Sequence, residues 1–424
     1  MITDIMRRTI LGKKEKFLFE GYREGMIDFD SIGSEIGLYI HIPFCKEICS
    51  YCPYNKTIYK RGMAGKYKKA IIHEIKLYSK ILKDKSITSV YIGGGTPTLM
   101  ADDLKEILEL IKKTFRFSGN IGIEAHPAEA KDELFDSLED IGVNLISLGV
   151  QTFNDKILDF LGRGYSSGEA DKALSIIKQY GFKCIDVDIM TNLPGQTMED
   201  IEYDISRAYS YDIDQLSVYP LIVFPMTKMG TAIRENELNR FNGLQEKKIL
   251  GLIDEISRKN GYKRSSVWTY GKDGGSRYTS VTRESFVGLG AGASSLAGGY
   301  FYLNTFSVEE YIKALEHGGL PINLVNRMSE KERMIFWIFW RCYDGVIDGE
   351  RFARLYNADL VKEFPLLFAM LKALGMTKVH DGRFELTEWG RYAYHLVEKQ
   401  YSVSYLNDLW HASMKQPWIE EIRL

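Results

Sequence analysis

The sequence has no long hydrophobic run. Its longest purely apolar stretch, residues 334–340, is bounded by Arg333 and Arg341, whereas a membrane-spanning helix needs about 20 apolar residues. Residues 1–17 contain basic side chains but no apolar segment or small-residue cleavage site of the kind that directs secretion. We therefore expect a protein without a membrane span that stays in a reducing cytoplasm.

An excess of charge of one sign is also missing. The chain of 424 residues has 55 basic and 57 acidic side chains and a net charge of −2. Because general binding to nucleic acids depends on a surplus of basic residues, we expect no nucleic-acid partner. The 45% hydrophobic and 26% charged fractions are those of a globular protein. At roughly 100–200 residues per domain, the length predicts two or three domains, or one large α/β barrel with attachments.

Cysteine is scarce, but its placement is informative. Of five cysteines, Cys45, Cys49 and Cys52 fall within eight residues, while Cys184 and Cys342 stand alone. The two isolated cysteines lie in strand-like and helix-like apolar segments, so we expect them to be ordinary core thiols. The histidines are scattered and form no metal-binding pattern.

From residue 37 onward, short β-rich segments alternate with longer amphipathic ones. The expected strands are residues 38–41, 89–92, 121–125, 145–149, 183–190 and 215–219. Between two of them, Asp102 is the expected N-cap of a helix whose buried face has the apolar spacing i, i+3, i+4, i+7. Six repeats of strand then helix predict a parallel sheet with helical crossovers, hence an α/β fold with a partial (β/α)6 barrel. In such folds the functional side chains lie at the carboxyl ends of the strands.

The pattern divides the chain into four parts: an N-terminal arm or short helix over residues 1–36, the barrel over 37–240, an accessory α/β segment over 241–322, and a C-terminal domain over 323–424. A break is expected at residues 321–326. Ser329 and Glu332 then form a capping box, and Pro365 suits the first turn of a later helix. Helices ending in a small hairpin predict a winged-helix-like domain, for which packing or covering a substrate is favoured over binding nucleic acid.

Cys45, Cys49 and Cys52 form a Cys-x3-Cys-x2-Cys run directly after the first expected strand. A disulfide with one odd thiol conflicts with a reducing compartment, and structural zinc needs four ligands, of which only three are present. Thiolates are the preferred ligands of iron–sulfur clusters. The spacing therefore favours a [4Fe–4S] cluster with one iron open to a non-protein ligand, a vacancy that the amino and carboxylate groups of S-adenosylmethionine (SAM) can fill.

These motifs resemble those of a known family. The cysteine spacing, its place after the first strand and the run Gly93-Gly-Gly-Thr-Pro97 resemble the radical SAM superfamily, and Tyr39-Ile-His-Ile-Pro-Phe-Cys45 is similar to its anaerobic coproporphyrinogen III oxidase-like (HemN-like) branch. Further agreement runs through Ser147–Phe153, Leu161–Arg163 and Leu193–Thr197, within residues 37–300. Three consecutive glycines at 93–95 would also leave the strand end bare, so that backbone could approach a bulky ligand.

The resemblance implies two bound SAM molecules. Contacts to the first match Tyr39, Gly94, Glu124 and, more loosely, Ile222. Contacts to the second match Tyr51, Gly95, Thr96, Gln151, Arg163 and Asp188. The residue types suit these roles, because Arg163 offers a planar fork for a carboxylate, Asp188 can accept from ribose hydroxyls, and Tyr51 can stack on adenine. For Glu124 a solvated loop acid, and for Arg163 a surface salt bridge, remain the alternatives.

The sequence also departs from its relatives. The oxidases have an extra cysteine where Tyr54 stands, and the haem chaperones have a His-Asn…Tyr-Trp run where this chain has Arg277–Arg283, and a histidine where it has Ser294. The run Gly288–Ala293 is expected to be a ligand-hugging loop. These departures favour the methyltransferase-like group of the branch. The resemblance implies that in this group the 5′-deoxyadenosyl radical abstracts a hydrogen atom from the methyl group of a second SAM. The methyl-derived carbon is then transferred to a planar conjugated molecule, for which a tetrapyrrole is the leading candidate.

Two alternatives stay open at this point. One is oxidative decarboxylation of a porphyrinogen, and the other is haem carriage without turnover. The resemblance further implies an electron donor such as a flavodoxin or ferredoxin, and we expect a monomer.

Overall fold

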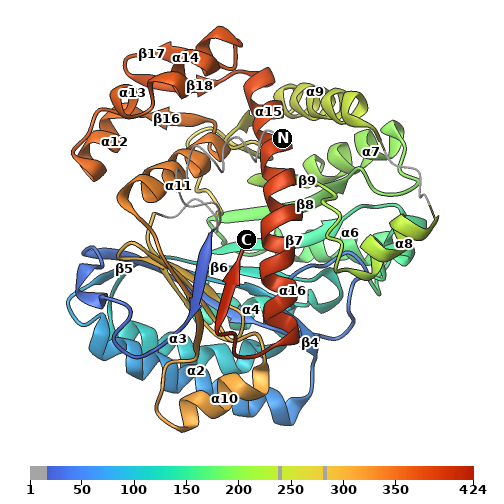
Figure 1. Ribbon diagram of the computed structural model, residues 1–424. Helices are drawn as coiled ribbons and strands as arrows, with labels where there is room; N and C mark the ends of the chain where they lie inside the picture. The colour runs from blue at the N-terminus through green and yellow to red at the C-terminus, as the bar shows by residue number, and fades with distance from the viewer. Residues whose placement is uncertain (1–16, 237–240, 280–283) are drawn as a thin grey trace.

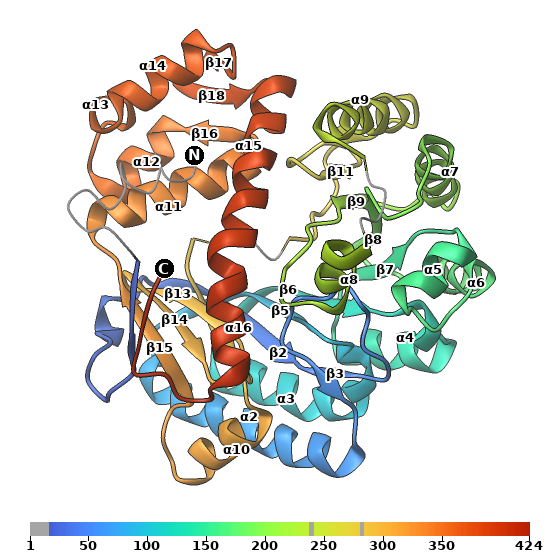
Figure 2. The same ribbon diagram turned by 45° about the vertical axis from the view of Figure 1, so that its right-hand side comes forward.

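The computed structural model describes residues 17–236, 241–279 and 284–424. Within them, fourteen strands form one mixed sheet with the order β10-β11-β9-β8-β7-β6-β5-β2-β12-β13-β14-β15-β1-β19. Figures 1 and 2 show helices below this sheet and beside it, a separate group of helices above one end, and one long helix running across the front.

The centre of the sheet is parallel and confirms the predicted α/β barrel. The six predicted strands are β2 (Glu35–Ile42), β5 (Ser86–Gly94), β6 (Arg116–Ala125), β7 (Leu145–Gln151), β8 (Cys184–Thr191) and β9 (Gln215–Pro220). They pair in this order, and a seventh parallel strand, β12 (Phe286–Leu289), pairs with the free side of β2. Because residues alternate between faces, Leu38, Ile40 and Ile42 are fully buried against the outer helices, whereas Tyr39 and His41 point inward.

Helices connect the parallel strands. They are α2 (Arg61–Ile81), α3 (Ala101–Thr114), α4 (Asp132–Asp140), α5 (Asp155–Leu161), α6 (Ser167–Ile177) and α7 (Met198–Tyr209). The predicted buried face of α3 is confirmed, since Leu104, Ile107, Leu108 and Ile111 are all buried. The predicted N-cap is wrong, because Met100 ends a 3-10 turn that leads directly into α3 and Asp102 lies inside its first turn. There its carboxylate faces the positive end of the helix.

The accessory segment continues the same sheet. After α8 (Lys228–Asn236) and α9 (Gly243–Lys259), strands β10 (Lys263–Arg264) and β11 (Thr269–Gly271) extend one edge, and β12, β13 (Ser294–Ala297), β14 (Tyr300–Asn304) and β15 (Ile322–Arg327) extend the other. The break expected at residues 321–326 is therefore wrong, because the five apolar and amide residues from Ile322 to Asn326 are buried in strand β15.

The two faces of this extension contact different parts of the chain. Tyr302 of β14 points to the outer side, where it accepts a hydrogen bond from Tyr78 of α2 at 3.4 Å. The preceding residue, Phe301, points to the other side and packs its ring against Phe336 of α11 (Glu330–Tyr343). Helix α10 (Val308–Glu316), between β14 and β15, joins α2 on the outer side. The sheet is thus covered by α2, α3 and α10 on one side and by C-terminal helices on the other (Figure 1).

The described part of the N-terminal arm contains a strand. Within residues 17–36, β1 (Leu18–Gly21) pairs with β15 and with the last strand, β19 (Glu421–Arg423), and a 3-10 turn follows at Phe29–Ser31. Residues 1–16 of the arm, and residues 280–283 of the Arg277–Arg283 run, lie outside the described residues. The four-part division of the chain stays a prediction.

The C-terminal region contains a small helical unit with its own apolar core. It consists of α11, α12 (Gly349–Tyr356), α13 (Leu360–Glu363) and α14 (Pro365–Ala373), with a sheet of β16 (Val346–Asp348), β18 (Arg383–Leu386) and β17 (Thr377–His380). The Ser329–Glu332 capping box and the position of Pro365 in the first turn of α14 are confirmed. Trp337, Phe352 and Phe364 are among the residues that form its core. Helices with a β17–β18 hairpin agree with the predicted winged-helix-like organisation.

The chain then returns to the barrel as one long helix. Helix α15 (Glu388–Tyr401) passes through a π-helical stretch, Ser402–Leu406, into α16 (Asn407–Lys415). Figure 2 shows it running between the extended sheet and the barrel. Among the described residues, no helix has both the length and the apolar character needed to cross a membrane.

We predict that Phe352→Ala will loosen the small C-terminal unit without affecting the barrel. Phe352 is fully buried and packs against Trp337 with ring centroids 5.6 Å apart, so the cavity should cost about 3–5 kcal/mol. Hydrogen–deuterium exchange should become faster at residues 330–386 and stay unchanged in β5–β7. Val361→Ala, at a 43% exposed site of the same unit, is the control. Equal acceleration in the barrel would contradict a separate C-terminal domain.

Candidate functional site

The three clustered cysteines lie at the carboxyl end of β2. Cys45 ends the short strand β3 (Phe44–Cys45), which pairs with β4 (Thr57–Ile58), and Cys49 and Cys52 lie on the loop between them. The loop is fastened at several points: Ser50 N–H donates to the carbonyl of Leu161 at 3.2 Å, and Lys56 Nζ donates to the carbonyls of Cys52 and Tyr54 at 2.6 and 3.0 Å. The cysteine loop, residues 45–56, is therefore held to the barrel independently of any ligand.

The end of β5 clamps the start of this loop. The N–H groups of Gly95 and Thr96 donate to the carbonyls of Ile42 and Phe44 at 2.8 and 2.7 Å. A Cβ atom at Gly95 would lie 2.6 Å from the Phe44 carbonyl oxygen and 2.7 Å from Cys45 Sγ. Glycine is required here because two backbones and a thiol meet.

The neighbouring glycines are packed against protein groups as well. A Cβ at Gly93 would lie 2.8 Å from Glu124 Oε1, and one at Gly94, which has φ +123°, would lie 2.8 Å from the ring of His41. We expected the three glycines to leave the strand end open to a ligand, but the space beside each of them is filled by protein atoms. The glycines bring the carboxyl ends of β2, β5 and β6 into contact.

Glu124 is not a solvated loop acid. Its carboxylate accepts hydrogen bonds from Gly94 N–H at 3.0 Å and from the Tyr91 hydroxyl at 2.9 Å. Burial raises the pKa of Glu124 to about 7, and these two hydrogen bonds oppose the rise. Tyr39, whose ring lies beside Tyr91, belongs to the same group. The structure thus brings Tyr39, Gly94 and Glu124 together.

A chain of hydrogen bonds links Tyr39 to the cysteine loop. His41 Nε2 lies 2.9 Å from the carbonyl of Asn55, which can only accept, so Nε2 carries the proton and Nδ1 accepts from the Tyr39 hydroxyl at 2.8 Å. Burial lowers the pKa of His41 to about 4, so the ring is neutral at pH 7. Asn55 Nδ2 donates in turn to the carbonyls of Ala291 and Phe306.

The Gly288–Ala293 loop packs against this chain. A Cβ at Gly290 would lie 2.4 Å from the carbonyl oxygen of His41, and one at Gly292 would lie 2.7 Å from Asn55 Nδ2. The glycines of this loop therefore allow close contact with β2 and with the cysteine loop, whereas we expected them to contact a ligand. Glu74, fully buried on α2, accepts from Gly290 N–H at 2.8 Å and fixes the loop from the outer side.

Arg163 is a buried cation beside the cysteine loop. Its guanidinium donates to the carbonyl of Gly149 at 2.6 Å, and Nη1 lies 3.5 Å from Cys49 Sγ and 3.4 Å from the Tyr51 hydroxyl. The residue is 9% exposed, so it is not a surface salt bridge. Tyr165 covers the guanidinium at 5.3 Å from its ring centroid.

Gln151 ends β7 in a left-handed backbone conformation, with φ +68°. Residues other than glycine rarely adopt this region, and such strain is common at functional sites. A Cβ at Gly149 would lie 2.9 Å from Gln151 Nε2 and 3.3 Å from Arg163 Nη2, so the three residues are neighbours.

Asp188 lies inside the barrel on β8. Its carboxylate accepts from the Ser147 hydroxyl at 2.8 Å. Burial raises the pKa of Asp188 to about 6, opposed by the Ser147 hydrogen bond and the Arg163 charge. Asp186, which the sequence analysis did not identify, lies on the same strand, where burial and the charge of Asp188 raise its pKa further. Tyr51, Gln151, Arg163 and Asp188 therefore form a second group.

Ile222 is the most loosely placed of the predicted contacts. It follows β9 in a segment without regular structure, held by the Leu221 N–H, which donates to the Thr191 carbonyl at 2.8 Å. The structure places it after the carboxyl end of β9, and among the described residues it is not joined by a hydrogen bond to the other predicted contacts.

The three thiols of the cysteine loop are not joined to one another. All five cysteines are free, which excludes the disulfide alternative. Burial, and then the nearby Cys52, raise the pKa of Cys45 to about 12. A cavity of about 200 Å³ adjoins Cys49 and Cys52 and is also lined by Lys56, Met226, Lys228 and Met414.

Two features of the site were missed by the sequence analysis. Asn55 and Lys56 belong to no motif, and their only sequence signal is that they lie three and four residues after Cys52. Tyr54 packs against Trp410 of α16 with ring centroids 5.7 Å apart, and no pattern could connect residues so distant in the chain.

Comparison with known proteins agrees with this geometry. The model of the radical SAM superfamily matches residues 39–208. The "Heme chaperone HemW" of Bacillus subtilis is 30% identical over 364 residues, which cover 83% of this chain and 95% of that protein. The oxygen-independent coproporphyrinogen III oxidase of Pseudomonas aeruginosa is 27% identical over 332 residues, covering 71% and 72%.

A solved structure shares the whole fold. The coproporphyrinogen III oxidase HemN of Escherichia coli superposes with a TM-score of 0.78 at 20% identity, covering 91% of this chain and 95% of that one. The names of these relatives give no support to methyl transfer, which stays a prediction. The matched model, the extent of the similarity to the chaperone and the shared fold lead to one conclusion: the chain belongs to the radical SAM superfamily and, within it, to the HemN-like branch.

Proposed function

We propose that this protein binds a [4Fe–4S] cluster through Cys45, Cys49 and Cys52, cleaves SAM reductively, and acts on a tetrapyrrole. One observation carries the proposal. The cysteine loop, the buried cation Arg163 and the buried acids Glu124 and Asp188 lie together at the carboxyl ends of the parallel strands.

The cysteine loop fits such a cluster. The three thiols act electrostatically on one another, Cys49 lies beside a fixed guanidinium, and a cavity adjoins the loop. Three cysteine ligands can hold three of the four irons of such a cluster. When bound and reduced, the cluster supplies the electron that splits SAM into methionine and the 5′-deoxyadenosyl radical.

The surrounding residues suit SAM. Tyr39, Gly94 and Glu124 form one group, and Tyr51, Gln151, Arg163 and Asp188 form another, which supports the proposal of two SAM positions. Carboxylates close to the strand ends can accept from the ammonium and ribose hydroxyls, while the Arg163 fork can hold a carboxylate. Gly95 and Thr96 position Cys45 through backbone contacts.

For the reaction on the substrate, we favour transfer of a methyl-derived carbon to the tetrapyrrole. Its support is the set of departures from the relatives: Tyr54 in place of the oxidases' cysteine, and Ser294 and the Arg277–Arg283 run in place of the chaperones' motifs. Tyr54 in particular argues against oxidative decarboxylation as the function, because the oxidases have a cysteine at this position.

Haem carriage is the second candidate. The specific observation in its favour is the 30% identity to a haem chaperone over 95% of that protein's length. An electron donor such as a flavodoxin or ferredoxin, a monomeric state and a location in a reducing cytoplasm remain predictions.

We expect Cys49→Ala to abolish cluster binding. With two thiolates the chain cannot hold three irons, so anaerobically reconstituted protein should lose the bound iron and the reductive cleavage of SAM. Iron analysis and detection of 5′-deoxyadenosine measure both. Cys342→Ala, which removes a thiol from α11, should leave them unchanged. Retention of a full cluster by the Cys49 variant would disprove the ligand assignment.

Arg163→Lys should keep the charge but lose the planar fork. We expect the KM for SAM to rise about 10-fold or more, since a hydrogen bond to a charged group contributes about 1.5–3 kcal/mol. Iron content should be retained. An unchanged KM would show that Arg163 does not contact SAM and that its role is to hold the Gly149 carbonyl by its hydrogen bond.

One product assay separates the candidate reactions. Reduced holoprotein is incubated anaerobically with SAM carrying a labelled methyl group and with a panel of haem, metal-free porphyrins and porphyrinogens. We expect 5′-deoxyadenosine, S-adenosylhomocysteine and a labelled tetrapyrrole of higher mass. Release of carbon dioxide without label would show decarboxylation. Stoichiometric haem binding without any product would show carriage.

A further inference from the structure

The cavity of about 200 Å³ beside the cysteine loop is open to the protein surface. It is bordered by Cys49 and Cys52 of the loop, by residues 226–228 at the start of α8, and by Met414 of α16. Met414 and Ile48, which also borders the cavity, are 39% and 38% exposed, so solvent reaches it. This outer cavity therefore leads from solvent to two of the three clustered cysteines.

The outer cavity is separate from the predicted SAM positions. All the predicted SAM contacts belong to the described part of the chain, and none of them borders this cavity. Arg163, although it lies 3.5 Å from Cys49 Sγ, is among the residues outside its border. The cysteine loop therefore presents one side to SAM and another to the outer cavity, so that a molecule bound there would not displace SAM.

The walls of the outer cavity are joined to one another. Met229 N–H donates to the Ser50 carbonyl at 3.0 Å, which ties α8 to the cysteine loop. Met226 N–H donates to Asn407 Oδ1 at 3.1 Å, which ties the segment before α8 to α16. Because these contacts join protein groups to protein groups, the cavity is preformed.

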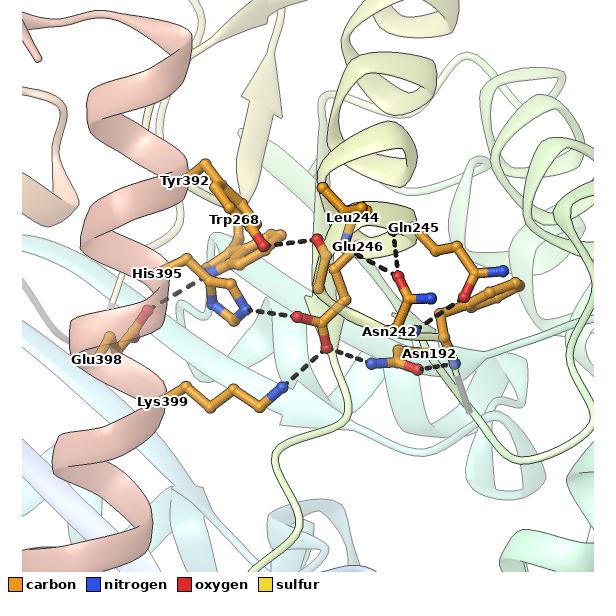
Figure 3. A network of polar contacts seen from close by, with 12 residues as sticks. Asn192, Asn242, Leu244, Gln245, Glu246, Trp268, Tyr392, His395, Glu398 and Lys399 are labelled. Atoms are coloured by element: carbon orange, nitrogen blue, oxygen red, sulfur yellow. Dashed lines mark hydrogen bonds and ion pairs between the residues drawn. The ribbon is translucent and has the colours of Figure 1, made fainter. Parts of the chain in front are cut away.

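A buried polar network holds the long C-terminal helix from its other end (Figure 3). Glu246 of α9 accepts from Lys399 Nζ of α15 at 2.8 Å and from the side chain of Asn192, which follows β8. Helix α15 continues through the π-helical stretch into α16. The network therefore helps to fix where α16, and with it Met414, lies relative to the barrel.

The charged side chains that border the outer cavity are of one sign. Lys56 and Lys228 border it, and among the described residues no acid does. Lys56 donates to carbonyls of the cysteine loop, whereas Lys228 is exposed. Lys228 is also the first residue of α8, where the helix dipole favours an acid over a cation. The stability of α8 therefore does not account for a lysine at this position.

We infer that the outer cavity is the docking site of the electron donor, a carrier protein with an acidic face that brings its redox group beside Cys49 and Cys52. The inference rests on the proposed function and extends it, because each cleavage of SAM needs one electron from outside the chain. In this step the carrier loses the one electron that the cluster receives, and no bond forms or breaks.

The surface suits such a partner. Ile48 and Met414 offer an apolar centre, and the lysines beside them match carboxylates on the carrier. Carrier and SAM must be bound at the same time, since the electron is used to cleave SAM. A carrier in the outer cavity meets this condition, because it contacts two predicted cluster ligands from a side that SAM does not occupy.

A direct test is to cross-link the cluster-containing protein to flavodoxin with a carbodiimide. This reagent joins a lysine to a carboxylate only where the two are in contact, and mass spectrometry of peptides identifies the lysine. We expect a cross-link at Lys228. We expect none at Lys113, an exposed lysine in the last turn of α3, just before β6 begins at the opposite edge of the sheet. Cross-links that omit Lys228 would overturn the inference.

A kinetic test compares two reductants. For Lys228→Glu with photoreduced flavodoxin, we expect the KM for flavodoxin to rise about fivefold at low ionic strength, with kcat unchanged, and the difference to vanish at about 0.5 M salt. With dithionite, which needs no docking site, SAM cleavage should equal that of the wild type. Met414→Glu, on the opposite wall, should raise the same KM, and Lys113→Glu is the matched control.

The remaining outcomes are distinct. Equal KM values for the wild type, Lys228→Glu and Met414→Glu would overturn the inference and leave the proposed function intact. Slower cleavage with dithionite in both variants would show a structural role and count against docking. Self-association of the wild type that is lost in Met414→Glu would assign the cavity to a second copy of this chain. Absence of SAM cleavage by the wild type with dithionite would refute the proposed function itself, and with it this inference.

Discussion

At the carboxyl ends of β2 and β5 two backbones approach so closely that no side chain fits between them. The N–H groups of Gly95 and Thr96 bond to the carbonyls of Ile42 and Phe44, and a Cβ at Gly95 would meet both Phe44 and Cys45. This contact fixes where β3 begins and thus where the first thiol lies. Asn55, at the far end of the cysteine loop, is then held between His41 and the glycine loop after β12. The site is therefore built on rigid strand ends, which suits a ligand that must be held in one geometry.

Buried acids gather above these strand ends. Burial raises the pKa values of Glu124, Asp186 and Asp188, and the cation Arg163 lies beside Cys49. Burying acids in this way is costly, and a bound cation would offset the cost; SAM carries a sulfonium and an ammonium. Glu246 shows the contrast, because an acid paired with Lys399 and His395 serves to join two parts of the fold.

Membership of the HemN-like branch accounts for the barrel, but the relatives in this branch include both a haem chaperone and an oxidase. A shared fold does not decide between them. The positions that differ from the relatives have distinct surroundings here: Tyr54 lies between the cysteine loop and Trp410, and Ser294 begins a strand of the main sheet.

Much of the fold was readable from the sequence. The six parallel strands, the buried face of α3, the Ser329 capping box and the crowded cysteines all depend on local periodicity or on spacing within a few residues, and such patterns are visible along the chain. The break expected at residues 321–326 and the N-cap at Asp102 were wrong, and the strand in the arm was not predicted. β1 and β15 are strands only because they pair with distant strands, β19 and β14, and a local pattern contains no information about such partners.

The sequence by itself was enough to predict the barrel and the superfamily, and the spacing of its cysteines predicted the ligands of a [4Fe–4S] cluster. Only the tertiary structure decided that the glycines serve close packing between strand ends, that Arg163 lies beside Cys49, and that Trp410, more than 350 residues after Tyr54, packs against that tyrosine of the cysteine loop. The physical reason is that burial and charge at a site depend on which segments the fold brings together. Spacing along the chain specifies ligands on one loop, whereas the opposite side of the site comes from a helix that returns to the barrel at the end of the chain.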